Sequence, residues 1–316
     1  MLPRSLLILG AAAAASTANA AYTLVDNYDR SNFFDSFTFF TDKDPTNGFV
    51  QYTTPQVANN RGLAGYAGNQ IYLGVDHTTQ NPASGRASVR VTSKKAYTRG
   101  LFVADITHMP EGCGVWPAFW TFGPNWPSSG EIDIIEGVNS QATNSLTLHT
   151  GPGCSVTNTG SLGSTKFVAG GSTDCGHAGG FSGCSQATAD SRTYGAGFNA
   201  AGGAVVAMEW TAEAIQMWQF SRGSPQASQA LSPNPVPSSW GPPLARFAGC
   251  DFDAHFRDHQ VVFNTDLCGD WAGQVWGQDA TCGKLAPTCQ QYVANNPGAF
   301  ADAYWMINAV KVFQSS

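Results

Sequence analysis

Three carboxylate residues in one short stretch are the part of this sequence best suited to chemistry. Residues 130–137 read GEIDIIEG, a pattern that predicts a β-strand with Glu131 and Asp133 on one face and isoleucines facing the core. Glu136 follows Glu131 by five residues, so a regular strand would turn it towards the core, where an unpaired carboxylate is costly. A β-bulge with Ile135 as the extra residue would return Glu136 to the acidic face, and bulges are frequent beside active sites.

Two glutamates that flank an aspartate on one surface suit the retaining hydrolysis of a glycosidic bond. In that reaction one carboxylate attacks the anomeric carbon and a protonated carboxyl group, about 5–5.5 Å away, releases the leaving group. A third carboxylate between them can hydrogen-bond the nucleophile and set the coupled titration of the pair. Two alternatives remain open, a solvated acidic strand edge and a calcium site, although calcium loops are richer in Asp, Asn and Gly.

Aromatic residues near the acidic stretch offer rings on which a sugar can stack. Trp116, Trp120 and Trp126 precede the stretch in the chain, and Trp271 follows far downstream. Trp126 stands in a turn rich in Gly and Pro, so we expect it to lie outside the core. His149 falls on the polar face of a predicted strand, where it could contact a ligand. Each of these side chains could instead fill an ordinary structural role.

The elements that must position these residues are mostly strands. Apolar and alternating segments predict strands at 101–106, 115–122, 145–150, 205–210, 215–220, 260–264 and 305–313. The clearest helix is Cys289–Asn295, with Thr288 as its N-cap and Pro297 beyond its end. Many short strands separated by glycine-rich turns indicate an all-β sandwich or barrel, and no linker or internal repeat divides the chain.

The composition excludes several classes of protein. Charged residues make up 12% of the 316 residues, aromatic residues make up another 12%, and the net charge is -6. A disordered chain would be rich in charge and poor in aromatic residues, and a coiled coil would be rich in Ala, Glu, Lys and Leu. With 16 basic residues against 22 acidic ones, the chain lacks the positive charge that nucleic-acid binding requires.

Residues 1–20 have the pattern of a secretory signal peptide. Arg4 precedes an apolar stretch at residues 6–15, and Ala18-Asn-Ala20 fits a cleavage site. The apolar stretch is too short to span a membrane, and no later segment approaches the length of a transmembrane helix. We therefore expect a secreted, extracellular protein with one domain over residues 21–316 and no membrane anchor in its mature form.

Eight cysteines follow the expected cleavage site, an even number that indicates disulfides in a secreted chain. They are Cys113, Cys154, Cys175, Cys184, Cys250, Cys268, Cys282 and Cys289. Their spacing does not resemble a zinc site, and we expect no metal. The glycine-rich segment 151–203 holds three of them and is expected to form stapled surface loops. If all eight cysteines pair, at least one bridge must leave this segment.

Residues 130–137 resemble the bulged signature of glycoside hydrolase family 16, and the chain is similar in particular to secreted fungal laminarinases. Similar segments are DPTNG (44–48), DHTT (76–79), HMPEGCG (108–114), WPAFW (116–120), LTLHT (146–150) and CGDWAG (268–273). The resemblance implies a concanavalin-like jelly-roll β-sandwich of two antiparallel sheets with a concave substrate groove. It implies Glu131 as the nucleophile, Asp133 as its assisting carboxylate and Glu136 as the acid/base. The residues implied to line the sugar subsites are Trp120, Trp126, His149 and Trp271.

This resemblance implies a secreted endo-β-glucanase that hydrolyses internal β-1,3 or β-1,4 bonds of β-1,3-glucans or mixed-linkage glucans such as laminarin and lichenan. We expect a retaining double displacement without a cofactor, a β-glucan polysaccharide as partner, no nucleic acid, and a monomeric state. Two other functions remain open. A cell-wall glucan transglycosylase would intercept the same intermediate with a sugar hydroxyl, and a non-catalytic, lectin-like protein would bind glucan on the same fold.

Overall fold

Two antiparallel sheets packed face to face form the body of the protein in its computed structural model, which describes residues 21–168, 171–176 and 183–315. Sheet A contains β1 (Tyr22–Asp29), β4 (Ala64–Ala67), β5 (Gln70–Gly74), β8 (Gly100–His108), β14 (Ala204–Trp210), β15 (Ala214–Ser221), β16 (Ala245–Ala248) and β18 (Tyr304–Ser315). Sheet B contains β2 (Phe37–Phe39), β7 (Arg90–Ser93), β9 (Val115–Phe122), β10 (Glu131–Glu136), β11 (Ser145–His149), β12 (Lys166–Phe167), β13 (Cys184–Ala187) and β17 (Gln260–Leu267). A short parallel pair, β3 (Val50–Tyr52) and β6 (Arg86–Ser88), completes the strands.

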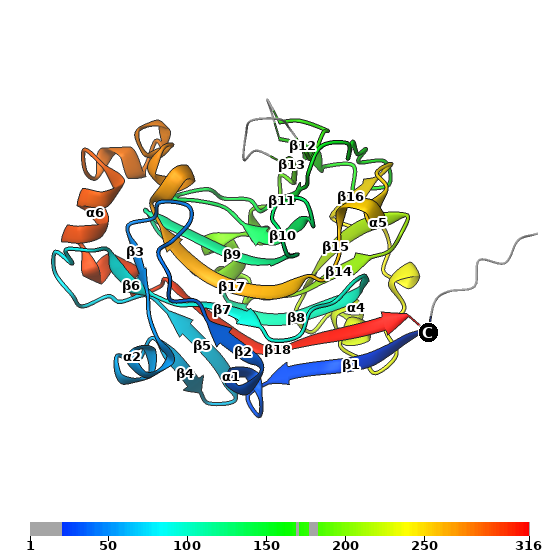
Figure 1. Ribbon diagram of the computed structural model, residues 1–316, viewed down its shortest axis with the longest axis horizontal. Helices are drawn as coiled ribbons and strands as arrows, with labels where there is room; N and C mark the ends of the chain where they lie inside the picture. The colour runs from blue at the N-terminus through cyan, green and yellow to red at the C-terminus, as the bar shows by residue number, and fades with distance from the viewer. Residues whose placement is uncertain (1–20, 169–170, 177–182, 316) are drawn as a thin grey trace, which may run out of the picture.

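The order of strands within each sheet shows how distant segments become neighbours. In sheet A the order is β16-β15-β14-β8-β18-β5-β4, with β1 paired to β18, and in sheet B it is β12-β13-β11-β10-β9-β17-β7-β2. Figure 1 shows the sheets as two layers whose long strands bend in the same direction, so that sheet B is concave on the side away from sheet A. The predicted all-β jelly-roll sandwich of two antiparallel sheets is confirmed.

The helices are short. They are α1 (Phe33–Ser36), α2 (Pro55–Asn60), α3 (Gly195–Ala200), α4 (Pro225–Ala230), α5 (Phe252–His255) and α6 (Cys289–Asn295), with helical turns η1 (Ser191–Thr193), η2 (Pro237–Ser239), η3 (Gly269–Gly273), η4 (Trp276–Gln278), η5 (Cys282–Lys284) and η6 (Pro297–Phe300). The predicted helix and N-cap are confirmed in α6, where the Thr288 hydroxyl accepts a hydrogen bond from the backbone of Gln291. Within the described residues, no helix is long and apolar enough to cross a membrane. The expected signal peptide lies outside the described residues.

Each strand expected from the sequence is present, with bounds that differ by a few residues. The short strands β1 to β7 are not predicted, because most span too few residues for an alternation to be read. The glycine-rich segment 151–203, expected to form loops, instead contributes β12, β13 and α3. Strand β13 pairs with β11 and so extends sheet B beyond the acidic strand. The sequence does not predict β13, because this strand has only four residues and lies in a segment rich in glycine.

The apolar face of β10 is buried between the sheets, as its alternation predicts. Ile132, Ile134 and Ile135 are each exposed by 1% or less. Beside them, Phe119 of β9 stacks on Phe263 of β17 with ring centroids 4.4 Å apart. Full burial of one such side chain contributes roughly 1.5–3 kcal/mol. This packing fixes the strands of sheet B and leaves their other face for polar residues.

All eight cysteines form disulfides. The bridges are Cys113–Cys282, Cys154–Cys250, Cys175–Cys184 and Cys268–Cys289. The bridge from Cys154 leaves the glycine-rich segment, as predicted, and ties it to the loop after β16. Cys282 ties the helical turns that follow β17 to the residues before β9. The turns at one end of sheet B are thereby fixed to the sheet.

Gly130 fixes the point at which β10 begins. Its φ is +83°, and a Cβ atom there would overlap the buried ring of Phe256 and the carbonyl oxygen of His255. We expect Gly130→Ala to lower the free energy of unfolding by about 2–5 kcal/mol, since a left-handed backbone costs roughly 1–2 kcal/mol and overpacking roughly 1–3 kcal/mol. Gly68→Ala is the control, because Gly68 has φ +61° but nothing within 4 Å of its Cβ position. Urea denaturation compares the two variants, and equal midpoints would contradict the prediction.

Candidate active site

A bulge in β10 brings three carboxylates onto one face of sheet B. Against β9, the register skips one residue between Asp133 and Ile135, so Ile134 is the extra residue. The prediction of Ile135 as the inserted residue is therefore wrong by one position. The reason is that pairing with β11 ends at Asp133, and the bulge follows at once. Beyond it, Glu136 returns to the face that carries Glu131 and Asp133.

Glu131 lies at the start of β10 between two of the predicted sugar-binding residues. The indole N–H of Trp126 donates a hydrogen bond to Oε2 of Glu131. On the other side, His149 of β11 is the direct strand partner of Glu131. Trp126 is 43% exposed, which confirms that it lies outside the core. The half-buried Glu131 carboxylate therefore has a donor at the surface and an imidazole beside it.

Asp133 occupies the centre of the acidic face and is 1% exposed. Its Oδ2 lies 3.4 Å from Nε2 of His149, and this buried oxygen has no hydrogen-bond partner among the described residues. Trp120 of β9 stands directly opposite Asp133 and shares its face. Burial, together with the negative charge of Glu136, raises the pKa of Asp133 well above its usual range.

Glu136 is held by Trp116, named above only as a ring on which a sugar could stack, and by Asn144, which the sequence did not single out. Nε1 of Trp116 donates a hydrogen bond of 2.9 Å to Oε1 of Glu136. The backbone N–H of Glu136 donates to Oδ1 of Asn144 at 2.8 Å. The position of Trp116 in the site could have been predicted, because Trp116 precedes Trp120 by four positions on one strand and therefore shares its face. Asn144 gave no such signal.

Burial raises the pKa of both glutamates. It raises the pKa of Glu131 to about 8, and the charge of Asp133 acts in the same direction. It raises the pKa of Glu136 to about 7, although the hydrogen bond from Trp116 stabilises the carboxylate and opposes the shift. Because the three carboxyl groups interact strongly, their protons belong to the group as a whole. The site therefore still holds protons near neutral pH.

Further along the sheet, aromatic and polar side chains form a continuous surface beside the acids. Nε1 of Trp120 donates to Oδ1 of Asn264 on β17 at 2.6 Å. The guanidinium of Arg90 on β7 lies 5.0 Å from the ring of Trp120 and 4.5 Å from that of Phe40. Arg90 is 9% exposed, and its Nε has no hydrogen-bond partner among the described residues. Sequence reasoning missed Arg90 and Asn264, whose strands are far from Trp120 in the chain.

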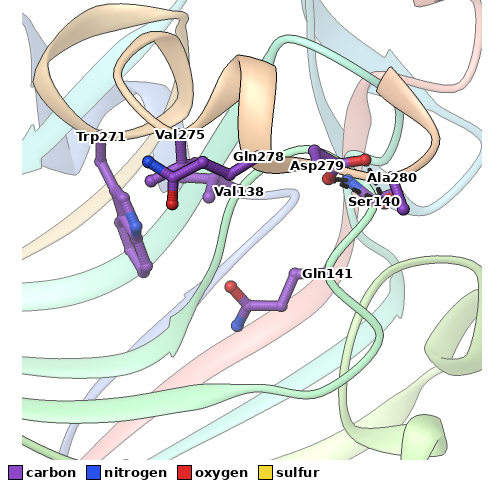
Figure 2. A pocket seen from close by; sticks show the side chains of 8 residues that line it. All are labelled: Val138, Ser140, Gln141, Trp271, Val275, Gln278, Asp279 and Ala280. Atoms are coloured by element: carbon purple, nitrogen blue, oxygen red, sulfur yellow. Dashed lines mark hydrogen bonds between the residues drawn. The ribbon is translucent and has the colours of Figure 1, made fainter. Parts of the chain in front are cut away.

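Trp271 lies at the end of the surface nearest Glu136. It stands in the turn η3 and meets Trp116 edge to face, with ring centroids 5.6 Å apart. Trp271 borders a cavity of about 270 Å³. Figure 2 shows Gln278 on the same side of this cavity and Gln141 across from it. The two walls are joined where the backbone and hydroxyl of Ser140 donate to Asp279 at 3.1 and 2.8 Å. An aromatic ring beside two amides is a surface suited to sugar hydroxyls and ring faces.

Glu131, Asp133 and His149 also offer donor atoms that lie within 4.8 Å of one another, close enough to share a metal ion. Two carboxylates and an imidazole are ligands that zinc accepts. Burial raises the pKa of both carboxyl groups, so a metal ion would have to displace protons from them to bind. The indole N–H of Trp126 also occupies one oxygen of Glu131. The arrangement therefore fits proton transfer better than metal binding.

The structure gathers all seven residues predicted for the site around one strand. The three acids share a face of β10, and Trp120 and His149 lie on the neighbouring strands opposite them. Trp126 donates a hydrogen bond to Glu131, and Trp271 packs against Trp116, which bonds to Glu136. A family model described as an XgeA-like, catalytic GH16 domain matches residues 37–313, which include every one of these positions.

The chain belongs to glycoside hydrolase family 16. Several of its relatives in this family are named as endo-1,3(4)-β-glucanases. The endo-1,3(4)-β-glucanase of Arthroderma benhamiae is 46% identical over 320 residues, which cover 99% of this chain and 69% of that protein. The chain spans only 50% of a probable endo-1,3(4)-β-glucanase of Aspergillus fumigatus, to which it is 42% identical.

Solved structures of family 16 enzymes have the same fold. An elongating family 16 β-1,3-glucosyltransferase has a TM-score of 0.85 at 41% identity, covering 93% of this chain and 100% of that one. Laminarinase 16A from Phanerochaete chrysosporium, with 6-O-glucosyl-laminaritriose in its donor and acceptor sites, has a TM-score of 0.85 at 38% identity and the same coverage. The family model and the curated relatives therefore identify this chain as a glycoside hydrolase, and the solved structures show that it has the family fold.

The bond from Trp116 to Glu136 can be tested by titration. Trp116→Phe removes the N–H donor and keeps an aromatic ring, so we expect the pKa of Glu136 to rise above about 7, because the ionised carboxylate loses a stabilising bond. 13C-NMR titration of the carboxyl carbons measures the shift. Trp271→Phe is the control, since it removes the same kind of group from the ring that packs against Trp116. A pKa that stays unchanged or falls in Trp116→Phe would contradict the prediction.

Proposed function

We propose that the chain is a retaining endo-1,3(4)-β-glucanase in which Glu131 is the nucleophile and Glu136 the acid/base. The observation that carries this proposal is the bulged strand β10, which has both glutamates on one face with Asp133 between them. Each glutamate has its own indole donor, from Trp126 in one case and Trp116 in the other. Two neighbouring carboxyl groups in different environments are what double displacement requires.

In the first step, the carboxyl group of Glu136 gives its proton to the glycosidic oxygen while the carboxylate of Glu131 bonds to the anomeric carbon. The C–O bond to the leaving chain breaks, and that chain departs with a new hydroxyl group. Within the shared titration of the three acids, the reactive form has Glu131 ionised and Glu136 protonated, and the hydrogen bond from Trp126 and the neighbouring imidazole of His149 favour ionised Glu131 against the effect of burial. The raised pKa of Glu136 keeps its proton available up to about pH 7.

In the second step, the carboxylate of Glu136 takes a proton from water, and the water oxygen bonds to the anomeric carbon. The bond to Glu131 breaks, which restores its carboxylate and leaves the product with its original configuration. Asp133 lies between the two glutamates and is nearly fully buried, so it can hydrogen-bond Glu131 throughout the cycle. The chemistry needs no cofactor.

The substrate in this proposal is a neutral β-1,3-glucan or mixed-linkage glucan, such as laminarin or lichenan. A neutral polymer is held by ring faces and uncharged polar groups, and the face around β10 offers them. Trp120, Trp126, His149 and Trp271 line the path, as the sequence resemblance implies. Arg90 is added as a residue that supports this surface, because its guanidinium lies over the ring of Trp120, 5.0 Å from the ring centroid. The protein acts as a monomer on this polymer.

The same proposal includes secretion, with residues 1–20 as a signal peptide and residues 21–316 as the catalytic domain. Four disulfides with no free cysteine among the described residues support an oxidising compartment.

A second candidate function is glucosyl transfer, in which a sugar hydroxyl replaces water in the second step. The observation that favours it is the similarity to the elongating β-1,3-glucosyltransferase, which is 41% identical and fully covered by this chain. The two functions share the covalent intermediate on Glu131 and differ only in the acceptor. Product length therefore distinguishes them.

Digestion of laminarin and lichenan, followed by NMR of the first products, tests the mechanism. We expect shorter oligosaccharides whose new reducing ends are initially in the β configuration. An initial α product would overturn the retaining mechanism, and oligosaccharides longer than a defined starting oligomer would favour transfer over hydrolysis.

Replacement of the nucleophile tests the assignment of residues. Glu131→Gln should lower kcat by at least about 10³-fold and leave glucan binding measurable by calorimetry, because the fold and the aromatic surface remain. Glu209→Gln is the matched control, since Glu209 is a half-buried carboxyl group of raised pKa that lies on sheet A. Activity near that of the wild type in Glu131→Gln would remove Glu131 from the mechanism.

A further inference from the structure

Asn144 holds the bulge of β10 from the side on which β10 has no strand partner. Strand β11 pairs with β10 at Glu131, Ile132 and Asp133, and the pairing stops there. Beyond that point, the side chain of Asn144 accepts from the N–H of Glu136 at 2.8 Å and donates to the carbonyl of Ile134 at 2.7 Å. A neighbouring strand would satisfy a donor and an acceptor in this way. One amide side chain thus replaces a strand at the bulge.

Asn144 is itself held in place. It is 1% exposed, and its backbone N–H donates to the hydroxyl of Thr193 at 3.1 Å. That hydroxyl donates to the carbonyl of Asp190 at 2.6 Å, which fixes it to the helical turn η1. Both groups that a side-chain amide offers to the bulge are used, and neither reaches solvent. The contact is therefore specific for an amide of this length.

We propose that Asn144 is a positioning residue that keeps the acid/base Glu136 on the acidic face of β10. This inference rests on the function proposed above. Because Glu136 lies five residues after Glu131, a strand without the bulge would turn its carboxyl group towards the core. The amide of Asn144 stabilises the bulged backbone, and the indole of Trp116 then fixes the carboxyl group. Loss of the amide should therefore impair proton donation more than nucleophilic attack.

Two aryl β-laminaribiosides that differ only in the leaving group separate these effects. 2,4-Dinitrophenolate departs without protonation, whereas phenolate needs a proton from the general acid. The sugar contacts are the same in both substrates, and kcat/KM for each reports the step that forms the glycosyl-enzyme. The ratio of the two values measured on one preparation is independent of the fraction of protein that is folded. This ratio therefore reports on the acid alone.

The reference variant is Glu136→Gln, which should lower kcat/KM for the phenyl substrate by about 10²–10⁴-fold and change it little for the dinitrophenyl substrate. We expect Asn144→Ala to show the same pattern at a smaller scale, about 10–100-fold for the phenyl substrate and under about threefold for the other. Asn144→Asp keeps the shape and the acceptor and loses the donor at neutral pH. If Asn144→Ala fails to fold, Asn144→Asp should still fold. Its ratio should lie between those of the wild type and Asn144→Ala at neutral pH. At pH 5 the ratio should return towards the wild-type value, because the buried carboxyl group of the new aspartate gains a proton and can donate again.

Asn139 supplies a matched control. It is also a buried asparagine, at 5% exposed, and its side chain accepts from the backbone of Gly114 and donates to that of Ala272, both at 2.9 Å. Asn139→Ala removes two hydrogen bonds of the same kind without touching the bulge. It should change both kcat/KM values by the same factor.

The outcomes distinguish the role of Asn144 from the assignment of Glu136 as the acid/base. A wild-type ratio in both Asn144 variants, together with a changed ratio in Glu136→Gln, would overturn the role of Asn144 and leave the mechanism standing. A wild-type ratio in Glu136→Gln would overturn the acid/base assignment on which the inference rests. A ratio in Asn139→Ala that changes as much as the ratio in Asn144→Ala would also overturn the role of Asn144, since loss of any buried amide would then have the same effect.

Discussion

The alternation of side chains along a β-strand is the constraint on which the rest of this structure depends. Two carboxyl groups five residues apart cannot share a face of a regular strand, and β10 solves this with one extra residue. The core face accommodates that residue because Ile134 and Ile135 are both buried. On the opposite face, the extra residue brings Glu136 into line with Glu131. Core packing and site chemistry are thus two results of one register shift.

The buried carboxyl groups on the acidic face of β10 lower the stability of the folded state as the pH rises. A glutamate side chain in an unfolded chain has a pKa of about 4.3. In the folded protein, burial raises the pKa to about 8 for Glu131 and about 7 for Glu136. The folded state therefore binds more protons between these values, and its stability falls as the pH rises through them. The stabilising contribution of these groups is complete only below their unfolded pKa. Four disulfides and the packed sheets must offset this loss at neutral pH.

The sequence predicts those parts of the site that depend on local pattern. The acidic strand, the need for a bulge and the exposure of Trp126 all follow from residues close together in the chain. Arg90 and Asn264 could not be found in this way, because they meet Trp120 only through the pairing of β17 with β7 and β9. The position of the bulge, and with it the role of Asn144, depends on where β11 stops pairing. That end point is a property of the whole sheet.

The cavity beside Trp271 lies outside the sheet that carries the acidic strand β10. Its lining residues stand in loops and helical turns (Figure 2). The disulfide Cys113–Cys282 ties the helical turns after β17 to the residues before β9. With the function proposed above, substitutions there would change the surface offered to a glucan while the strand pairing of β10 stays as it is. Substrate range could then evolve separately from the chemistry on β10, and selection for a new polysaccharide would act first on these turns.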